Sequence, residues 1–192
     1  MPNPVLHHVN LKTTQLKAMI RWYGEVTGMR PNHVAAVGAW LTNDAANHRL
    51  ALLAVPGLAD DAAKDVHTGL HHLAFEFDSF ADLFDSFERL QGQGIVPAFC
   101  LDHGLTISMY YADPDRNLVE LQADAYGDWA RSTDYIRQSP VFAANPIGVF
   151  FDPAQVLRAL RAGGSASALH EAIMAEKFLP DPIPPLAGLP RP

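Results

Sequence analysis

Residues 103–120 read HGLTISMYYADPDRNLVE, and this stretch decides the fold that we expect. Its first half is rich in β-branched and aromatic residues, Asp113–Asn117 consists of turn-forming residues, and an apolar strand resumes at Leu118. The pattern predicts a β-hairpin. Glu120 lies in its second strand, where a carboxylate is rarely buried unless it is paired or binds a metal. In an isolated hairpin, Glu120 would simply be an edge-strand residue that faces water.

The rest of the chain repeats one pattern twice: a strand that begins near a His-His pair, then a helix, then further strands. The expected strands are 4–11, 34–41, 48–55, 69–77 and 95–101, and the expected helices run from about 15 to 27 and from about 80 to 92. We therefore predict an α/β (α+β) fold in which paired βαβββ modules, about 4–57 and 69–124, form an open barrel.

The character of the chain changes after the second module. We expect one domain that contains both modules over residues 1–125, and a C-terminal extension over 126–192. Within the extension, 150–162 and 165–177 predict two helices, and the proline-rich tail that follows predicts extended chain. The extension carries no catalytic motif, so its role stays open.

Composition excludes several functional classes. The net charge is -7 and there is no basic run, which argues against a nucleic-acid partner. No apolar run approaches the roughly 20 residues of a membrane span. The N-terminus lacks a signal-peptide pattern, and a single cysteine, Cys100, fits a reducing compartment, so we expect a cytoplasmic protein. Nine histidines favour metal or proton chemistry.

Strand alternation chooses between the adjacent histidines. In residues 70–77 the odd positions, which include His71, form the more apolar set and suit packing beneath the helix, whereas His72 faces the other way. The same alternation in the first strand separates His7 from His8. His8 and His72 therefore occupy equivalent positions on the concave face of matching strands.

Two imidazoles and one carboxylate, from His8, His72 and Glu120, make up the facial arrangement that holds non-haem Fe(II). Such a site leaves neighbouring coordination positions for a substrate and dioxygen. The same nitrogen and oxygen ligands also suit Mn, Zn and Ni, so the residues alone leave the metal open.

Over residues 4–124 the chain resembles the vicinal oxygen chelate superfamily, and specifically its single-domain type I extradiol catechol dioxygenases. The shared pattern is a histidine, an aliphatic-Tyr pair, Asp-Pro and a ligand glutamate, here His103, Met109-Tyr110, Asp113-Pro114 and Glu120. The resemblance implies that His8, His72 and Glu120 bind Fe(II), with Mn(II) as the other possibility.

The resemblance also implies roles for three further residues. His48, in the turn that begins at Asn47, matches the acid–base histidine of the family. His103 and Tyr110 match residues that lie near substrate and dioxygen. Where the family's turn usually has Gly, this chain has Arg116, which would be strained by roughly 1 kcal/mol at positive φ unless Asn117 takes that conformation instead.

The implied function is an extradiol ring-cleaving dioxygenase that acts on a catechol-type vicinal diol and O2, in a homo-oligomer whose subunits each hold a complete site. One alternative is a glyoxalase I-like isomerase. Such enzymes use four protein ligands, and the strand at 49–55 offers no acidic residue. The other alternative is a metal-free small-molecule binding protein, which normally lacks the three ligands. Which catechol is cleaved, and whether the metal is Fe or Mn, stays open.

Overall fold

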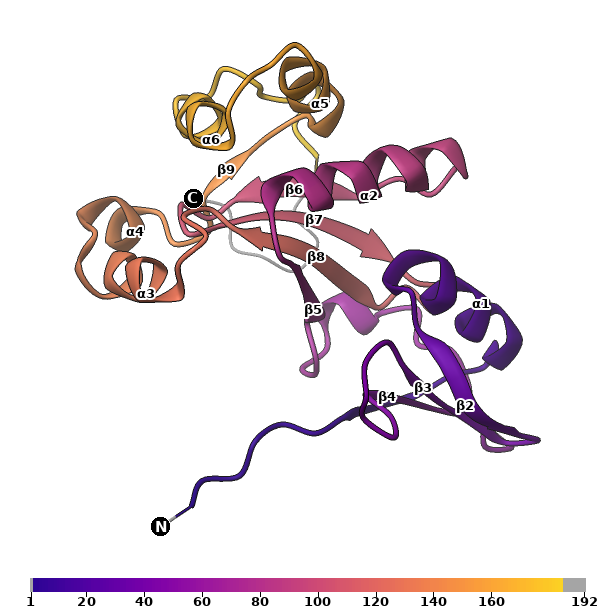
Figure 1. Cartoon of the computed structure of the whole chain (residues 1–192). Coiled ribbons are helices and arrows are strands. Elements are labelled where there is room, and N and C mark those ends of the chain that lie inside the picture. Colours follow the sequence, from indigo (N-terminus) through magenta and orange to yellow (C-terminus); the bar gives the residue numbers. More distant parts are fainter. Residues whose placement is uncertain (1, 185–192) are drawn as a thin grey trace. The chain divides into compact units, whose positions relative to one another are not determined.

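A computed structural model describes residues 2–184 of the chain (Figure 1). These residues form a mixed α+β fold with two sheets and six α-helices, and the sheets do not form a closed barrel. The chain divides into two compact units. Unit 1 contains the residues up to His67 together with Asp113–Asn117, and unit 2 contains Thr68–Ala112 and the chain from Leu118 onward.

Unit 1 contains the first module. Its elements are β1 (Val9–Lys12), α1 (Leu16–Thr27), β2 (Arg30–Ala35), β3 (Gly38–Thr42), β4 (Leu50–Leu53) and a short 3-10 helix, η1 (Lys64–Val66). The sheet order is β1-β4-β3-β2, with β1 and β4 parallel. The buried face of α1, which includes Met19 and Tyr23, contributes to the core of this unit. The helix ends at Thr27, as predicted, and Gly28 follows it with φ at 68°.

Unit 2 contains the second module. Its elements are β5 (His72–Phe77), α2 (Phe80–Gly92), β6 (Phe99–Asp102), β7 (Thr106–Ala112) and β8 (Leu118–Asp124), in a sheet of order β5-β8-β7-β6-β9. The first strand again pairs in parallel with the last. This shared topology confirms the predicted pair of βαβββ modules. Ser79 caps α2 by accepting from the backbone N–H of Asp82, which agrees with the predicted start of this helix at about residue 80.

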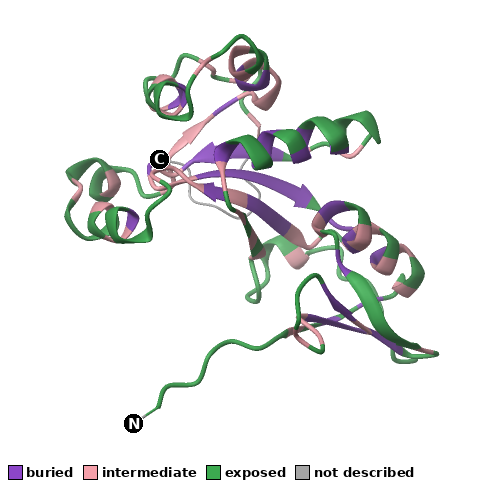
Figure 2. Cartoon of the chain, in the orientation of Figure 1, coloured by how far each residue is buried: buried purple, intermediate pink, exposed green. Residues whose placement is uncertain are grey.

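Helix α2 packs against β5 and β8. Its inward side chains are buried while its outer face is exposed (Figure 2). Apart from Ser86, the buried residues are large and apolar: Phe80, Leu83, Phe84, Phe87 and Leu90. Burial of such side chains stabilises by about 1.5–3 kcal/mol each. The helix thus covers one face of the unit 2 sheet and leaves the other face available for polar residues.

The extension belongs to unit 2 and has more structure than predicted. Its elements are α3 (Trp129–Gln138), α4 (Pro140–Ala144), β9 (Val149–Phe150), α5 (Pro153–Arg161) and α6 (Ala166–Met174). The predicted helices over 150–162 and 165–177 correspond to α5 and α6, whereas α3, α4 and β9 were not predicted. Of the predicted extended tail, residues 185–192 lie outside the described residues. Among the described helices, none is long and apolar enough to cross a membrane.

The turn between β7 and β8 lies in unit 1 and is closed by a buried carboxylate. Asp113 accepts hydrogen bonds from the backbone N–H of Asn117 at 2.8 Å and from the hydroxyl of Tyr23 at 3.1 Å. Arg116 itself adopts the left-handed conformation, with φ at 64°. The first of the two predicted outcomes at this turn is therefore confirmed, and a side chain occupies a position that favours glycine.

Candidate active site

The open face of the unit 2 sheet collects most of the polar residues singled out in the sequence. Glu120 pairs with Ala74 of β5 on one side and with Tyr110 of β7 on the other. Residues directly opposite in neighbouring strands share a face, and alternate residues along a strand do too. His72, two residues before Ala74, and Tyr110 therefore share the face of Glu120, opposite to the face that α2 covers.

Glu120 is the centre of a hydrogen-bonded cluster on this face. Its Oε2 lies 3.0 Å from Nε2 of His72, and its Oε1 accepts from the hydroxyl of Tyr110 at 3.0 Å. The Tyr110 oxygen lies 2.9 Å from Nε2 of His103. The side chain of Glu120 is only 6% exposed, whereas that of His72 is 33% exposed. The buried carboxylate thus lies beside an imidazole that solvent can reach.

Glu120 is ionised in this setting. Burial raises its pKa, but hydrogen bonds from His72 and Ser108 and the charge of His72 outweigh burial, so the pKa of Glu120 is lowered from its usual value. An ionised carboxylate and an imidazole nitrogen that face each other are both electron-pair donors to a cation. Their geometry therefore fits a divalent metal.

Tyr110 links the carboxylate to His103, because its hydroxyl donates to Glu120 and its oxygen contacts Nε2 of His103. Burial and then the charge of Glu120 raise the pKa of Tyr110, so its hydroxyl stays protonated. Burial lowers the pKa of His103, although the charge of Glu120 opposes that effect. His103 is thus a neutral imidazole near neutral pH, held beside a tyrosine hydroxyl.

The remaining predicted residues, His8 and His48, lie in unit 1 and contact each other. Their ring centroids are 4.3 Å apart, and with His7 they form a group whose ligand nitrogens lie within 4.8 Å of one another. Nδ1 of His48 lies 2.7 Å from the side-chain oxygen of Asn47, which can only accept. Nδ1 therefore carries the hydrogen, and Nε2 of His48 keeps its lone pair.

Desolvation, followed by the charges of His8 and His7, lowers the pKa of His48. The imidazole is consequently unprotonated near neutral pH and can accept a proton at Nε2. A turn histidine with this tautomer has the properties of a general base.

The two His-His pairs repeat the same contact, which the sequence did not predict. Nδ1 of His7 lies 3.1 Å from Nδ1 of His8, and Nδ1 of His71 lies 2.8 Å from Nδ1 of His72. The prediction that His71 packs beneath the helix is wrong: β5 begins only at His72, so His71 lies before the strand and is exposed. In each pair the first histidine contacts Nδ1 of the second, and in the second pair Nε2 of His72 faces Glu120.

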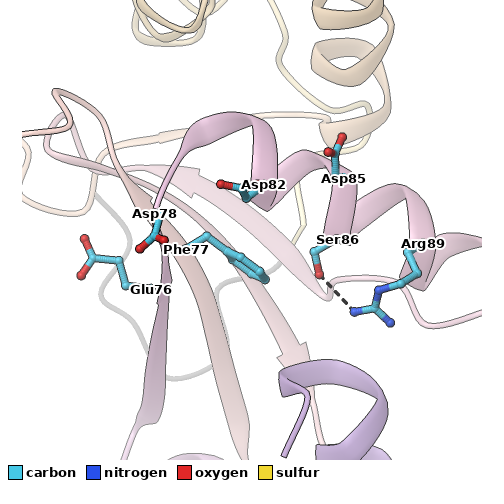
Figure 3. Close-up of a pocket in the computed structure, with 7 residues that line it drawn as sticks. All are labelled: Glu76, Phe77, Asp78, Asp82, Asp85, Ser86 and Arg89. Atoms are coloured by element: carbon cyan, nitrogen blue, oxygen red, sulfur yellow. Dashed lines mark hydrogen bonds between the residues drawn. The ribbon is translucent and has the colours of Figure 1, made fainter. Parts of the chain in front are cut away.

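A hollow of about 490 Å³ lies along α2 and the end of β5 (Figure 3). Its walls carry four carboxylates, from Glu76, Asp78, Asp82 and Asp85, and an Arg89 that bonds Ser86 at 3.3 Å. Asp82 accepts from the Ser79 hydroxyl, and Asp85 from Arg161. None of the predicted site residues lines this hollow, and we assign it no function.

The family model of the glyoxalase/bleomycin resistance protein/dioxygenase superfamily matches residues 5–121. The chain belongs to this superfamily. The match spans both modules and ends one residue after Glu120, so it includes every residue predicted for the site. The extension lies beyond it.

Two curated relatives of this superfamily member share nearly its full length. Biphenyl-2,3-diol 1,2-dioxygenase 2 of Rhodococcus globerulus is 37% identical over 97% of this chain and 97% of that protein. Biphenyl-2,3-diol 1,2-dioxygenase 3 of the same organism is 38% identical over 91% of each. The likeness therefore continues through the extension.

Solved structures support the fold alone. A glyoxylase/bleomycin resistance protein/dioxygenase domain from a Frankia species has a TM-score of 0.53 at 22% identity, and covers 64% of this chain and 93% of its own. A glyoxalase/dioxygenase from Nostoc punctiforme has a TM-score of 0.51 at 24% identity, and covers 62% of this chain and 90% of its own.

Proposed function

We propose that this protein is an extradiol dioxygenase that opens the ring of a catechol-type diol with O2, and that its metal is Fe(II) bound by His8, His72 and Glu120. The observation that supports it most is the buried, ionised Glu120 with His72 at 3.0 Å and Tyr110 at 3.0 Å. The names of the two full-length relatives support the same reaction and a biaryl diol as the first substrate to test.

A bound ferrous ion supplies a Lewis-acidic, redox-active centre with positions for both reactants. The chain's own residues hold the donors in place. The Tyr110 hydroxyl fixes one oxygen of Glu120, and His71 and His7 hold Nδ1 of the neighbouring ligand histidines. Such partners orient the metal ligands, and their loss typically lowers metal affinity or activity by about 10- to 100-fold.

Proton transfer is assigned to His48. Its Nε2 keeps a lone pair because Nδ1 donates to Asn47, and its lowered pKa keeps it unprotonated near neutral pH. We infer that Nε2 accepts the proton of a diol hydroxyl and returns it later in the reaction. His103 and Tyr110 provide hydrogen-bond donors next to Glu120, where they would bind the oxygen atoms of the reactants.

The test is anaerobic loading with Fe(II), followed by addition of catechols and O2. We expect a yellow ring-fission product together with oxygen uptake. Parallel loading with Mn(II) decides between the two metals. If no diol is cleaved and the adduct of methylglyoxal and glutathione is isomerised, the glyoxalase I-like alternative replaces the proposal. If neither reaction occurs and no metal binds, the protein is a metal-free binding protein.

Variants test the ligands separately from the base. His8→Ala, His72→Ala and Glu120→Gln should lose bound metal and activity together, whereas full metal content in all three would overturn the ligand assignment. His48→Phe should keep its metal and lose about 10²–10⁴-fold in turnover. His33→Ala is the matched control, because His33 is an exposed histidine of β2 that belongs to neither cluster.

A further inference from the structure

A second hollow of unit 2, of about 360 Å³, lies between α3 and the open face of the sheet. Residues from β5, β7 and β8 line its floor, and residues of α3 line its wall: Glu76, Leu105, Thr106, Gln122, Asp124, Trp129, Ser132, Thr133 and Ile136. Neither the superfamily match nor the proposed ligand set includes the α3 wall. This hollow therefore needs its own interpretation.

The floor of the hollow continues the face that carries the proposed metal ligands. Glu76 pairs with Gln122, one step along the sheet from the pair of Ala74 and Glu120. Two residues along a strand correspond to about 7 Å. The residue on this face between His72 and Glu76 is Ala74, whose short, exposed side chain leaves room above the sheet. Glu76 and Gln122, which line the hollow, thus lie one such step of about 7 Å along the sheet from the pair of Ala74 and Glu120.

Polar side chains connect Glu120 with the hollow. Ser108 hydrogen-bonds Glu120, and the Ser108 hydroxyl also lies 3.4 Å from the hydroxyl of Thr106, which lines the hollow. The cluster around Glu120 and the hollow are therefore neighbouring parts of one surface of unit 2.

The wall exposes apolar surface toward this face. Trp129 is 67% exposed and Ile136 is 48% exposed, and Leu105 lies on the opposite rim. Trp129 is held by a hydrogen bond of 2.8 Å from its indole N–H to Oε1 of Glu76. An exposed indole that is fixed in orientation offers a rigid flat surface to a ring. Such surface is stabilised when an apolar group covers it.

We propose that this hollow is a specificity subsite that binds a neutral aryl substituent of the diol, with Trp129 and Ile136 as its specificity-determining residues. The inference rests on the proposed function for the position of the diol ring. Glu76 and Asp124 give the hollow a negative charge, so it should disfavour a substituent that carries a carboxylate. Asp124 is already engaged by Ser132 and by the backbone N–H of Tyr126.

The kinetic test compares biphenyl-2,3-diol with unsubstituted catechol in the Fe(II)-loaded enzyme. In Trp129→Ala and Ile136→Ala the ratio of kcat/KM for the biaryl diol to that for catechol should fall by about tenfold. Catechol cleavage itself should stay unchanged. Val141→Ala is the matched control, since Val141 is an exposed apolar residue of α4 outside the hollow, at 55% exposure. An unchanged ratio in both variants, with catechol still cleaved, would overturn the subsite and leave the proposed function standing.

A binding test removes the dependence on turnover. The metal-free protein is titrated with ortho-phenylphenol, which has an aryl substituent but only one hydroxyl, and with phenol, while tryptophan fluorescence is recorded. We expect ortho-phenylphenol alone to quench the fluorescence, and Trp129→Phe to lose that quenching. If Trp129→Phe is quenched like the original chain, the subsite is wrong, whatever the enzyme does to catechols.

A charge-removal test addresses the chemical class of the substituent. Glu76→Gln keeps an oxygen that can accept from the indole of Trp129 but removes the charge. This variant should improve kcat/KM for a catechol with a propionate side chain by about fivefold or more, because repulsion between like charges at close range is lost. If kcat/KM for this catechol does not improve, the charge of Glu76 plays no part in the specificity of the hollow.

Discussion

Removal of His170 should strongly destabilise the protein, because its partner is a carboxylate with no access to water. Nδ1 of His170 in α6 lies 2.7 Å from Oδ2 of Asp102 in β6. The side chain of Asp102 is 0% exposed and that of His170 is 13% exposed. In His170→Ala, Asp102 keeps the backbone N–H of Gly104 but loses its positive partner. Removal of one partner of a buried ion pair typically lowers the free energy of unfolding by about 3–5 kcal/mol. We expect a loss of about 3 kcal/mol here, because water can enter the space that His170 leaves.

The chain contains a matched control for this prediction. Nδ1 of His67 lies 2.6 Å from Asp61, but the two side chains are 61% and 49% exposed. His67→Ala should therefore have little effect on the free energy of unfolding, because solvent screens an exposed pair. The free energy of unfolding of each variant is measured by urea titration, with tryptophan fluorescence and circular dichroism as probes. Equal losses in the two variants would refute the reasoning, since burial is the difference between the pairs.

The loss should also depend on pH. Burial lowers the pKa of His170, but the hydrogen bond and charge of Asp102 outweigh it, so the pKa of His170 in the folded protein is raised. Its stabilising contribution is fully present below the ordinary histidine pKa of about 6.5 and decreases as pH rises through the raised folded value. The difference in the free energy of unfolding between the original chain and His170→Ala should therefore shrink as pH rises above the ordinary histidine pKa of about 6.5. A difference that grows over this range would contradict the assignment.

Three further predictions concern other parts of the structure. Arg116→Asn should raise the free energy of unfolding by about 0.5–1 kcal/mol in urea titrations, because Asn tolerates the φ of 64° better than Arg; a loss of stability would contradict this. Gly148→Ala should lower the melting temperature and turnover together, because a Cβ would meet the carbonyl oxygen of Asp102 just before His103, and an unchanged melting temperature would refute the clash. His71→Ala should weaken Fe(II) binding by about tenfold while His33→Ala does not, as measured by competition with a chelator; equal affinities would remove the orienting role of His71.

The placement of His72 and Glu120 on one sheet face was accessible from the sequence because a strand has a side-chain period of two. Once two modules were recognised, that period separated the polar face from the face that packs against α2. The same argument failed for His71 and for His8, since each lies one residue before its strand begins, at His72 and Val9, and alternation does not constrain it. Element boundaries of this kind depend on hydrogen bonding between distant segments, which local composition does not determine.

The extension was the least predictable region. Helix α3 has its exposed apolar residues, Trp129 and Ile136, aimed at a hollow and not at a core, so the usual buried stripe is missing. Its cap was visible in principle, because Asp128 accepts from the N–H of Ala130. The pair of His170 and Asp102 joins residues 68 positions apart, and neither residue has a local pattern that identifies its partner.

Strand β9 determines where the chain can be shortened. Val149 and Phe150 pair with Asp102 and Leu101 of β6, so the extension occupies the outer edge of the unit 2 sheet. A protein that ended where the superfamily match ends, at residue 121, would leave the hydrogen-bonding groups of β6 unpaired beside apolar side chains. Unprotected edges of that kind recruit strands from other molecules. The residues that match the superfamily are therefore fewer than those needed to cover the edge of this sheet. We expect a shortened version of this protein to need β9 in order to stay free of aggregation.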